Sequence, residues 1–377
     1  MQDLLAAAER HREETIALIE ALAAIESPST DKAAVDRCGA ELARRLTALG
    51  GRVSTLPQAT AGDHVRAEFG DGPAQVLVLG HFDTVWPVGQ LARMPITRTP
   101  TALAGPGVFD MKAGIAQAML AVRALADVGR LAATRVVMLW TSDEEVGSTS
   151  SRAALEAEAR RSRAVLVLEP ALAGGAVKTA RKGVGDFTVT ARGVSAHAGV
   201  EPGRGASAIH ELARQALQVL ALADETRGLT VNVGRISGGT RANVVAESAA
   251  MDVDVRIATL ADAERVTAAM EALRPTDSRV ILSVTGGIDR PPMERTPGTV
   301  ALFERARHIA RRLGRDLSEG GTGGGSDGNF TSAIGAPTLD GLGPEGAGAH
   351  ALDEHILLEP LAFRAALLAG LFENPED

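Results

Sequence analysis

The first half of the chain alternates between strand and helix patterns. Continuous apolar runs predict strands that are buried on both faces, and segments with apolar residues at helical spacing separate them. The predicted strands cover residues 75–80, 134–140 and 164–168, and the helices between them cover residues 112–126 and 151–159. Strands that alternate with helices and have two buried faces predict a three-layer α/β domain with a mostly parallel sheet.

The pattern changes near Lys182, where apolar and polar residues begin to alternate as in half-buried strands. The predicted order is strand 187–190, helix 206–222, strands 229–236 and 251–257, helix 260–273 and strand 280–284. This β-α-β-β-α-β order is the ferredoxin-like plan, an α+β arrangement with helices on one face of an antiparallel sheet. A helix over residues 299–313 then resumes the first pattern. We therefore predict one domain from residues 1–181 and 291–377, with residues 182–290 inserted into it.

Composition and charge limit the kind of partner. The 377 residues are 45% hydrophobic and 23% charged, as in globular proteins, and 39 basic against 47 acidic residues give a net charge of −8. Because binding to phosphate backbones needs a basic surface, we expect no nucleic-acid partner. No run approaches 18 apolar residues, so we expect no membrane partner. The single cysteine, Cys38, and a start without a signal-peptide pattern lead us to expect a cytoplasmic protein.

Histidines and carboxylates gather where the predicted strands end. His81 and Asp83 follow the first strand and share a face in an extended chain, so Asp83 can accept the second N–H of a metal-bound imidazole. Glu169 follows the third strand, while Asp110 and His350 lie in glycine-rich stretches. Open α/β sheets place their sites at the carboxyl ends of strands. Each residue alone has an ordinary explanation, such as a surface His-x-Asp pair or a helix N-cap for Asp110.

Three consecutive acids, Asp143, Glu144 and Glu145, follow the second predicted strand. Like charges repel in a low dielectric, so such a run is costly unless a cation neutralises it. Adjacent side chains point apart, which lets one glutamate ligate a metal while the other takes a proton from water. The alternative is a solvated helix start, where acids are favourable. Taken together, two histidines and three carboxylates are suitable ligands for a pair of zinc ions.

Four segments together resemble a known superfamily. They are His81–Val85, Gly105–Gly114, Asp143–Gly147 and the late His350. This motif order is similar to that of the co-catalytic zinc exopeptidases of the aminoacylase and carboxypeptidase superfamily, and to bacterial glutamate carboxypeptidases in particular. The resemblance implies a three-layer zinc-exopeptidase fold with an inserted dimerisation, or lid, domain.

The same resemblance implies a role for each residue of the first domain. One zinc ion would be held by His81 and Glu169, and the other by Glu145 and His350. Asp110 would bridge the two ions, and Co²⁺ or Mn²⁺ could replace zinc. Glu144 would be the general base, and Asp83 would orient His81.

The inserted domain carries further similar segments. His197, in a Ser-x-His segment, would stabilise the oxyanion in the site of the partner subunit of a homodimer, and Asn243 would help to hold the substrate. Arg256 and Arg290 match arginines that bind a substrate carboxylate, a task for which a planar guanidinium is suited. Gly325 lies in a glycine-rich stretch whose backbone can approach that carboxylate.

These expectations define one function and two alternatives. The first is a di-zinc metallohydrolase that cleaves the amide bond before a C-terminal, acidic, glutamate-like amino acid of a small peptide or N-acyl conjugate. The second is an N-acyl-amino-acid or N-carbamoyl-amino-acid deacylase of the same superfamily. Only the arginines at positions 256 and 290 favour the first function over this one. The third is a non-catalytic metal-binding assembly protein. The absence of one or more of the five predicted metal ligands would have indicated this alternative, but all five are present in the sequence.

Overall fold

A computed structural model describes residues 1–373 and divides the chain into two compact units. Unit 1 comprises Met1–Ala180, Arg295–Gly321 and the chain from Ser326 onward, and unit 2 comprises Arg181–Glu294 and Thr322–Gly325. The sequence boundaries at 182 and 290 did not include this last short segment. It clusters with unit 2 because the Lys182 N–H donates to the Thr322 carbonyl at 3.0 Å, and the Arg181 guanidinium donates to the carbonyls of Gly324 and Gly325.

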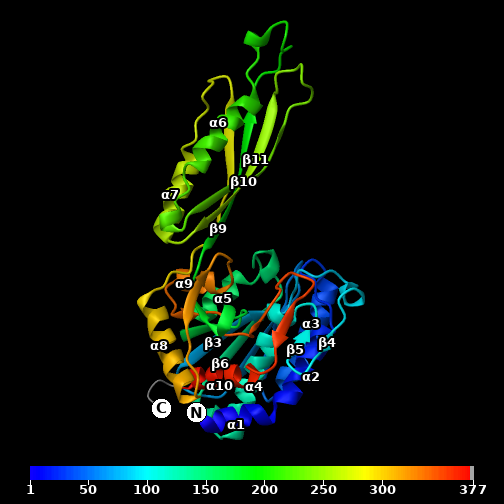
Figure 1. Ribbon diagram of the computed structural model, residues 1–377, viewed down its shortest axis with the longest axis vertical. Helices are drawn as coiled ribbons and strands as arrows, with labels where there is room; N and C mark the ends of the chain where they lie inside the picture. Colours follow the sequence, from blue (N-terminus) through cyan, green and yellow to red (C-terminus); the bar gives the residue numbers. More distant parts are fainter. Residues whose placement is uncertain (374–377) are drawn as a thin grey trace. The chain divides into compact units, whose positions relative to one another are not determined.

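Unit 1 is built on a six-stranded sheet with the order β1-β2-β6-β3-β7-β14. Figure 1 labels β3 and β6 of this sheet. The strands are β1 Arg52–Leu56, β2 His64–Phe69, β3 Gln75–His81, β6 Arg135–Thr141, β7 Ser162–Val167 and β14 Thr338–Leu339. Strands β6, β3, β7 and β14 are parallel, whereas β1 and β2 pair antiparallel at one edge. The mostly parallel sheet predicted from the sequence is therefore confirmed.

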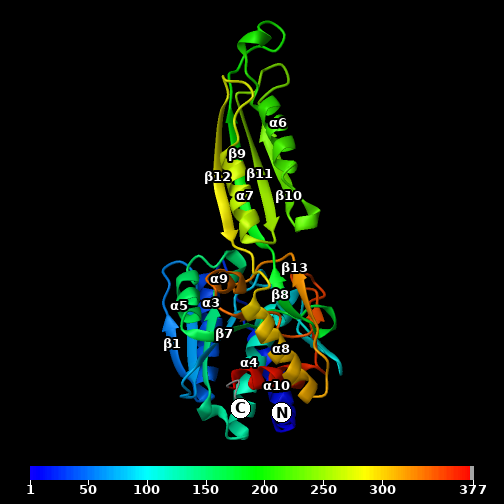
Figure 2. The same cartoon turned by 90° about the vertical axis from the view of Figure 1, so that its left-hand side faces the viewer.

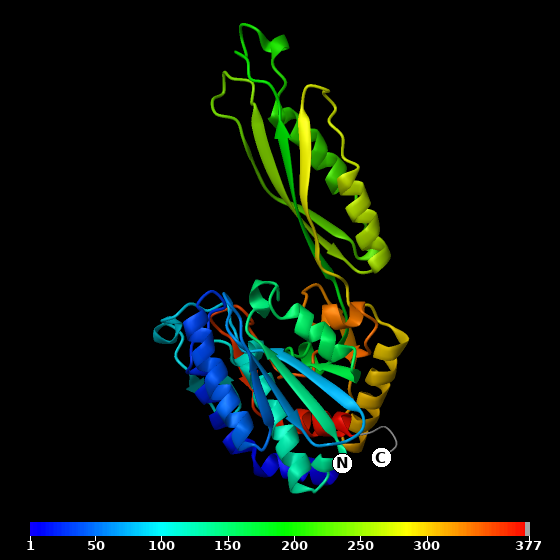
Figure 3. The same cartoon turned by 180° about the vertical axis from the view of Figure 1, so that it is seen from behind.

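Helices cover both faces of this sheet (Figure 3). Because side chains of a strand alternate between faces, Val76 and Val78 of β3 join one apolar core and Leu77 and Leu79 join another. The first core includes residues of α1 Gln2–Arg10, α3 Lys32–Ala48, α4 Ala113–Asp127, α8 Pro297–Arg312 and α10 Leu361–Phe372. The second includes residues of α5 Arg152–Ala159 and α9 Gly328–Ala333. These are the three layers that the sequence predicts.

Smaller elements complete unit 1. Helix α2, Arg12–Ala23, packs through Ile16 and Ile19 on a small antiparallel sheet with the order β15-β16-β5-β4. Its strands are β4 Thr97–Arg98, β5 Ala102–Ala104, β15 Gly346–Ala347 and β16 His355–Leu357. A two-stranded sheet joins β8 Val177–Arg181 to β13 Glu319–Thr322.

Unit 2 has the order β9 Gly183–Arg192, α6 Ala208–Leu220, β10 Thr230–Gly238, β11 Ser248–Ile257, α7 Leu260–Glu271 and β12 Ile281–Arg290. Its four strands pair antiparallel in the order β10-β11-β9-β12, and both helices pack against them (Figure 2). Alternate residues such as Val189 of β9 and Val253 of β11 form the core beneath the helices. The ferredoxin-like plan is confirmed.

Between residues 1 and 373, no helix is both long enough and apolar enough to span a bilayer. The cytoplasmic location stays a prediction.

Candidate metal centre

Strand ends and loops of unit 1 carry all five predicted metal ligands. His81 is the last residue of β3, Glu169 lies two residues beyond β7, and Glu145 lies in a 3-10 turn, Glu144–Val146, that follows β6. Since β6, β3 and β7 are parallel neighbours, their carboxyl ends meet at the same edge of the sheet. The other two come from the loop before α4, which holds Asp110, and the loop between β15 and β16, which holds His350.

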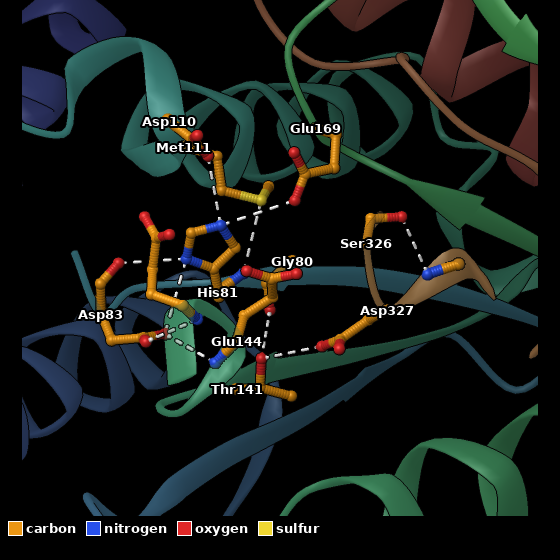
Figure 4. Close-up of polar contacts among 12 residues, drawn as sticks. Gly80, His81, Asp83, Asp110, Met111, Thr141, Glu144, Glu169, Ser326 and Asp327 are labelled. Carbon is orange, nitrogen blue, oxygen red and sulfur yellow. Dashed lines mark hydrogen bonds and ion pairs between the residues drawn. The ribbon is translucent and has the colours of Figure 1, made fainter. Parts of the chain in front are cut away.

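His81, Asp110 and Glu169 form the first group of possible ligands (Figure 4). His81 Nε2 lies 3.2 Å from Asp110 Oδ1 and 3.5 Å from Glu169 Oε1. The opposite ring nitrogen, Nδ1, lies 3.0 Å from the backbone oxygen of Asp83, to which it can donate, and this directs Nε2 towards the carboxylates. Burial alone would lower the pKa of His81, but the surrounding carboxylates raise it well above its ordinary value.

Asp110, Glu145 and His350 form the second group. His350 Nε2 lies 3.4 Å from Asp110 Oδ2 and 3.2 Å from Glu145 Oε2. The two carboxylates raise the pKa of His350 to about 10, whereas burial raises the pKa of Glu145. Burial would also raise the pKa of Asp110, but His350 and His81 together lower it. Asp110 thus presents one oxygen to each group.

The donor set fits metal ions. Zinc bonds of about 2.0–2.1 Å in tetrahedral geometry place neighbouring ligand atoms about 3.3 Å apart, close to the separations of both groups. The Oδ1 atom of Asp110 is buried and accepts no hydrogen bond of good geometry, and its nearest charged neighbour is His81 Nε2 at 3.2 Å, so a cation between the two groups would satisfy both. Asp110 does not act as a helix N-cap, because α4 starts at Ala113 after Lys112. Each group can therefore hold one ion, with Asp110 shared between them.

Asp83 connects this centre to the turn that carries the two glutamates. Its buried carboxylate accepts the backbone N–H groups of Glu144 and Glu145 at 3.3 and 3.2 Å, and the Ser29 hydroxyl at 2.7 Å. Its Oδ1 lies 3.5 Å from His81 Nδ1, farther than its own backbone oxygen. Asp83 therefore contacts His81 through both main chain and side chain, while its carboxylate mainly holds the turn.

The sequence analysis assigned no role to Glu354, a buried acid that supports the loop of Asp110. The carboxylate of Glu354 is buried, and it accepts three backbone N–H groups and one indole N–H, from Gly107, Phe109, Asp110 and Trp86, at 2.8–3.0 Å. Its position four residues after His350, next to the apolar run Ile356–Leu358, was the available signal.

The remaining predicted site residues belong to unit 2, where they form separate local groups. His197 is exposed, its Nδ1 accepts the N–H groups of Gly199 and Val200, and its segment pairs with that of Asn243, whose carbonyl accepts the Ala198 N–H.

The predicted carboxylate-binding residues of unit 2 differ in their surroundings. The guanidinium of Arg256 is held by both carboxylate oxygens of Asp254 on the same strand, at 2.8 and 3.0 Å. Arg290 is buried and lies beside Gly325, where an added Cβ would come within 3.0 Å of the Arg290 side chain.

Known proteins resemble this chain in sequence and in fold. The model of the peptidase family M20/M25/M40 matches residues 77–374. Carboxypeptidase G2 of Pseudomonas sp. (strain RS-16) is 29% identical over 358 residues, which cover 92% of this chain and 85% of that protein. The succinyl-diaminopimelate desuccinylase of Leptothrix cholodnii is 31% identical and covers 90% and 93% of the two chains. The crystal structure of aminopeptidase PepT from Bacillus cereus superposes with a TM-score of 0.78, at 23% identity, over 96% of this chain and 98% of that one.

The family model and the curated relatives give the class of this chain, which is that of the metal-dependent amide hydrolases. The chain belongs to peptidase family M20/M25/M40.

Proposed function

We propose that this enzyme removes a C-terminal, glutamate-like amino acid from a small peptide or N-acyl conjugate by hydrolysing the preceding amide bond. The proposal rests on one observation, the convergence of two histidines and three carboxylates into two groups that share Asp110. We further propose that both groups hold zinc, since imidazole and carboxylate suit this ion. Bound zinc ions supply polarisation of the scissile carbonyl and activation of water.

Glu144 is the proposed general base. It takes a proton from the attacking water and delivers it to the nitrogen of the leaving amino acid, as one carboxylate can do in sequence. The Asp83 carboxylate supports this role because it holds the backbone N–H of Glu144, next to the proposed ligand Glu145. Asp83 is proposed to orient His81 as well.

Residues of unit 2 are proposed to bind the substrate. Arg290 and the Gly325 backbone would receive its carboxylate, with Asn243 as a further contact, and burial of Arg290 beside Gly325 supports this choice. Arg256 would take part only if its guanidinium were shared with Asp254. We also propose a homodimer that forms through unit 2, in which His197 stabilises the oxyanion in the site of the other subunit.

A second candidate is an N-acyl-amino-acid deacylase. The specific support is the set of relatives named succinyl-diaminopimelate desuccinylase, one of them 31% identical over nine-tenths of this chain. The two candidates share the same metal centre and differ in which side of the amide bond is recognised.

The test is hydrolysis by zinc-loaded protein of a substrate panel that varies only the C-terminal residue, run beside N-acetyl-, N-benzoyl-, N-succinyl- and N-carbamoyl-amino acids. Preference for a C-terminal glutamate across several acyl groups supports the first candidate, and dependence on the acyl group alone supports the second. Glu144→Gln should lower kcat by about 10²–10⁴-fold while metal content, measured by mass spectrometry, stays at the wild-type level. Activity that survives this substitution would overturn the role of Glu144. Zinc-loaded protein that hydrolyses nothing would favour a non-catalytic assembly protein.

A further inference from the structure

Residues 142–150, here called the glutamate turn, carry both Glu144 and Glu145, yet the turn contributes little apolar packing of its own. Val146 is 54% exposed, and Gly147 and Thr149 are also exposed. Apolar burial, which positions most chain segments, therefore does not fix this one. Its position depends on hydrogen bonds instead.

His64 holds the glutamate turn at both ends. It is the first residue of β2 and is completely buried. Its Nδ1 lies 2.9 Å from the hydroxyl of Ser142, and its Nε2 lies 3.2 Å from the hydroxyl of Ser150. One imidazole from a different strand thus bridges the first and last residues of the turn.

The hydroxyl hydrogens give this bridge a direction. Ser142 donates its only hydroxyl hydrogen to the carbonyl of Gly62, so the Nδ1–H of His64 must donate to Ser142. Ser150 lies on the other side of the ring, and both its N–H and its hydroxyl lie 2.7 Å from Asp143 Oδ2. A neutral His64 with its proton on Nδ1 can only accept at Nε2, so the single hydroxyl hydrogen of Ser150 goes either to Nε2 or to Asp143 Oδ2. The Ser150 N–H donates to Asp143 Oδ2 in either case, so Ser150 contacts both the imidazole and the carboxylate of the residue that precedes Glu144.

Asp327 holds the turn from a second direction. Its carboxylate accepts the hydroxyl of Thr141, the last residue of β6, at 3.1 Å, and the hydroxyl of Ser148 (Figure 4 shows the contact with Thr141). The Ser148 N–H donates to the Asp143 carbonyl at 2.8 Å. Asp327 is 2% exposed and immediately precedes α9. Asp327 therefore contacts the hydroxyls of Thr141 and Ser148, one on each side of the two glutamates. His64 contacts the hydroxyls of Ser142 and Ser150 in the same way.

We propose that His64 and Asp327 are positioning residues of the hydrolytic reaction, which keep Glu144 and Glu145 in place relative to Asp110 and His350. This inference rests on the proposed function. Buried polar groups that support metal ligands typically change metal affinity or activity about 10–100-fold when they are removed. Their effect should appear in kcat, because the turn carries the proposed base and ligand while the proposed substrate contacts lie in unit 2.

The test compares neighbouring hydroxyls of the same turn. Ser150→Ala breaks the link between His64 and Asp143, Ser150→Thr keeps the hydroxyl, and Thr149→Ala removes an exposed hydroxyl as the matched control. Asp327→Asn tests the second contact. Steady-state kinetics with the best substrate of the panel are combined with the visible absorption spectrum of the cobalt-loaded protein, which reports the coordination of the bound ion, and with the melting temperature.

We expect Ser150→Ala and Asp327→Asn to lower kcat about 10–100-fold with KM changed less than about threefold, and to alter the cobalt spectrum. Ser150→Thr should restore most of kcat, and Thr149→Ala should leave both readouts unchanged. A Ser150→Ala enzyme with wild-type kcat and an unchanged cobalt spectrum would overturn the proposal. If wild-type protein hydrolyses no substrate, the proposed function fails, and the cobalt spectra alone then decide whether these residues position the turn.

Discussion

The carboxylate of Glu354 accepts the backbone N–H of Asp110 at 3.0 Å. Glu354 belongs to the loop that also carries His350, so one loop supplies a candidate ligand and supports the main chain of another. Burial raises the pKa of Glu354, while the N–H groups that it accepts oppose this effect by favouring the ionised form. Asp110, which belongs to both candidate metal groups, is therefore held at its backbone by a buried carboxylate.

Glu354→Gln should destabilise the protein although the two side chains have the same shape. The amide would direct an NH₂ group at N–H donors, which leaves at least one of them without an acceptor, at a cost of about 1–3 kcal/mol. Urea denaturation of the metal-free protein measures this cost, and a zinc titration should show about tenfold weaker binding. Glu359→Gln is the control, because Glu359 is 72% exposed in its pair with Arg315 and should change stability by less than about 0.5 kcal/mol. Equal stability of both variants would contradict the prediction.

Metal content should depend on Asp110 more than on either histidine. His350→Ala removes a proposed ligand of one group only, so we expect one tightly bound ion per chain, against the two that we propose for the wild type. Asp110→Ala removes an oxygen from both groups and should leave neither ion tightly bound. Mass spectrometry after dialysis gives the ratio, and His308→Ala on the exposed side of α8 is the control. Two ions retained by Asp110→Ala would show that Asp110 is not shared.

Asp83→Asn should lower kcat by about tenfold or more with both ions still bound. The substitution replaces one carboxylate oxygen with a donor, so it loses an acceptor for the backbone N–H of Glu144 or Glu145. Ser29→Ala removes only the hydroxyl that donates to Asp83, and a smaller decrease is expected. Kinetics and metal analysis of the same samples compare the decreases in kcat of the two variants. A larger decrease for Ser29→Ala than for Asp83→Asn would contradict the prediction.

Glu41 should contribute a pH-dependent part of the stability. Hydrogen bonds from Arg44 and Arg45 lower the pKa of this α3 carboxyl from its ordinary 4.5 to about 2. A lowered pKa in the folded state means that the stabilisation is fully present above pH 4.5 and is lost as the pH falls towards 2. Because Glu41 and its two arginine partners are partly exposed, we expect Glu41→Gln to lower the free energy of unfolding by about 1 kcal/mol at pH 7 and by less than half of that at pH 3. Denaturation curves at the two pH values provide the measurement, and a constant difference would refute the linkage.

The sequence allowed much of the fold to be predicted, because the fold depends on local patterns, and the same patterns pointed to the candidate ligands, whose assignment to two ions came from the family resemblance. Continuous apolar strands identify a parallel sheet, and polar residues such as His81 and Glu169 at their carboxyl ends must then share an edge. Very short strands such as β14 and β16 have too few residues for a periodic pattern and were not predicted.

Supporting contacts were not accessible in the same way. His64 and Asp327 contact the glutamate turn from 78 and 179 residues away along the chain. In the sequence, His64 is only one polar residue at the start of a strand, and nothing local indicates which hydroxyls it will meet. Likewise, the N-cap explanation of Asp110 was reasonable until the structure placed the first residue of α4 at Ala113.

The return of Thr322–Gly325 to unit 2 limits how this protein can be divided for engineering. A fragment that ended at Glu294 would omit the carbonyls of Gly324 and Gly325, and Arg181 would lose two of its acceptors. Grafting unit 2 onto another hydrolase therefore requires both stretches of chain, joined by a linker that replaces residues 295–321.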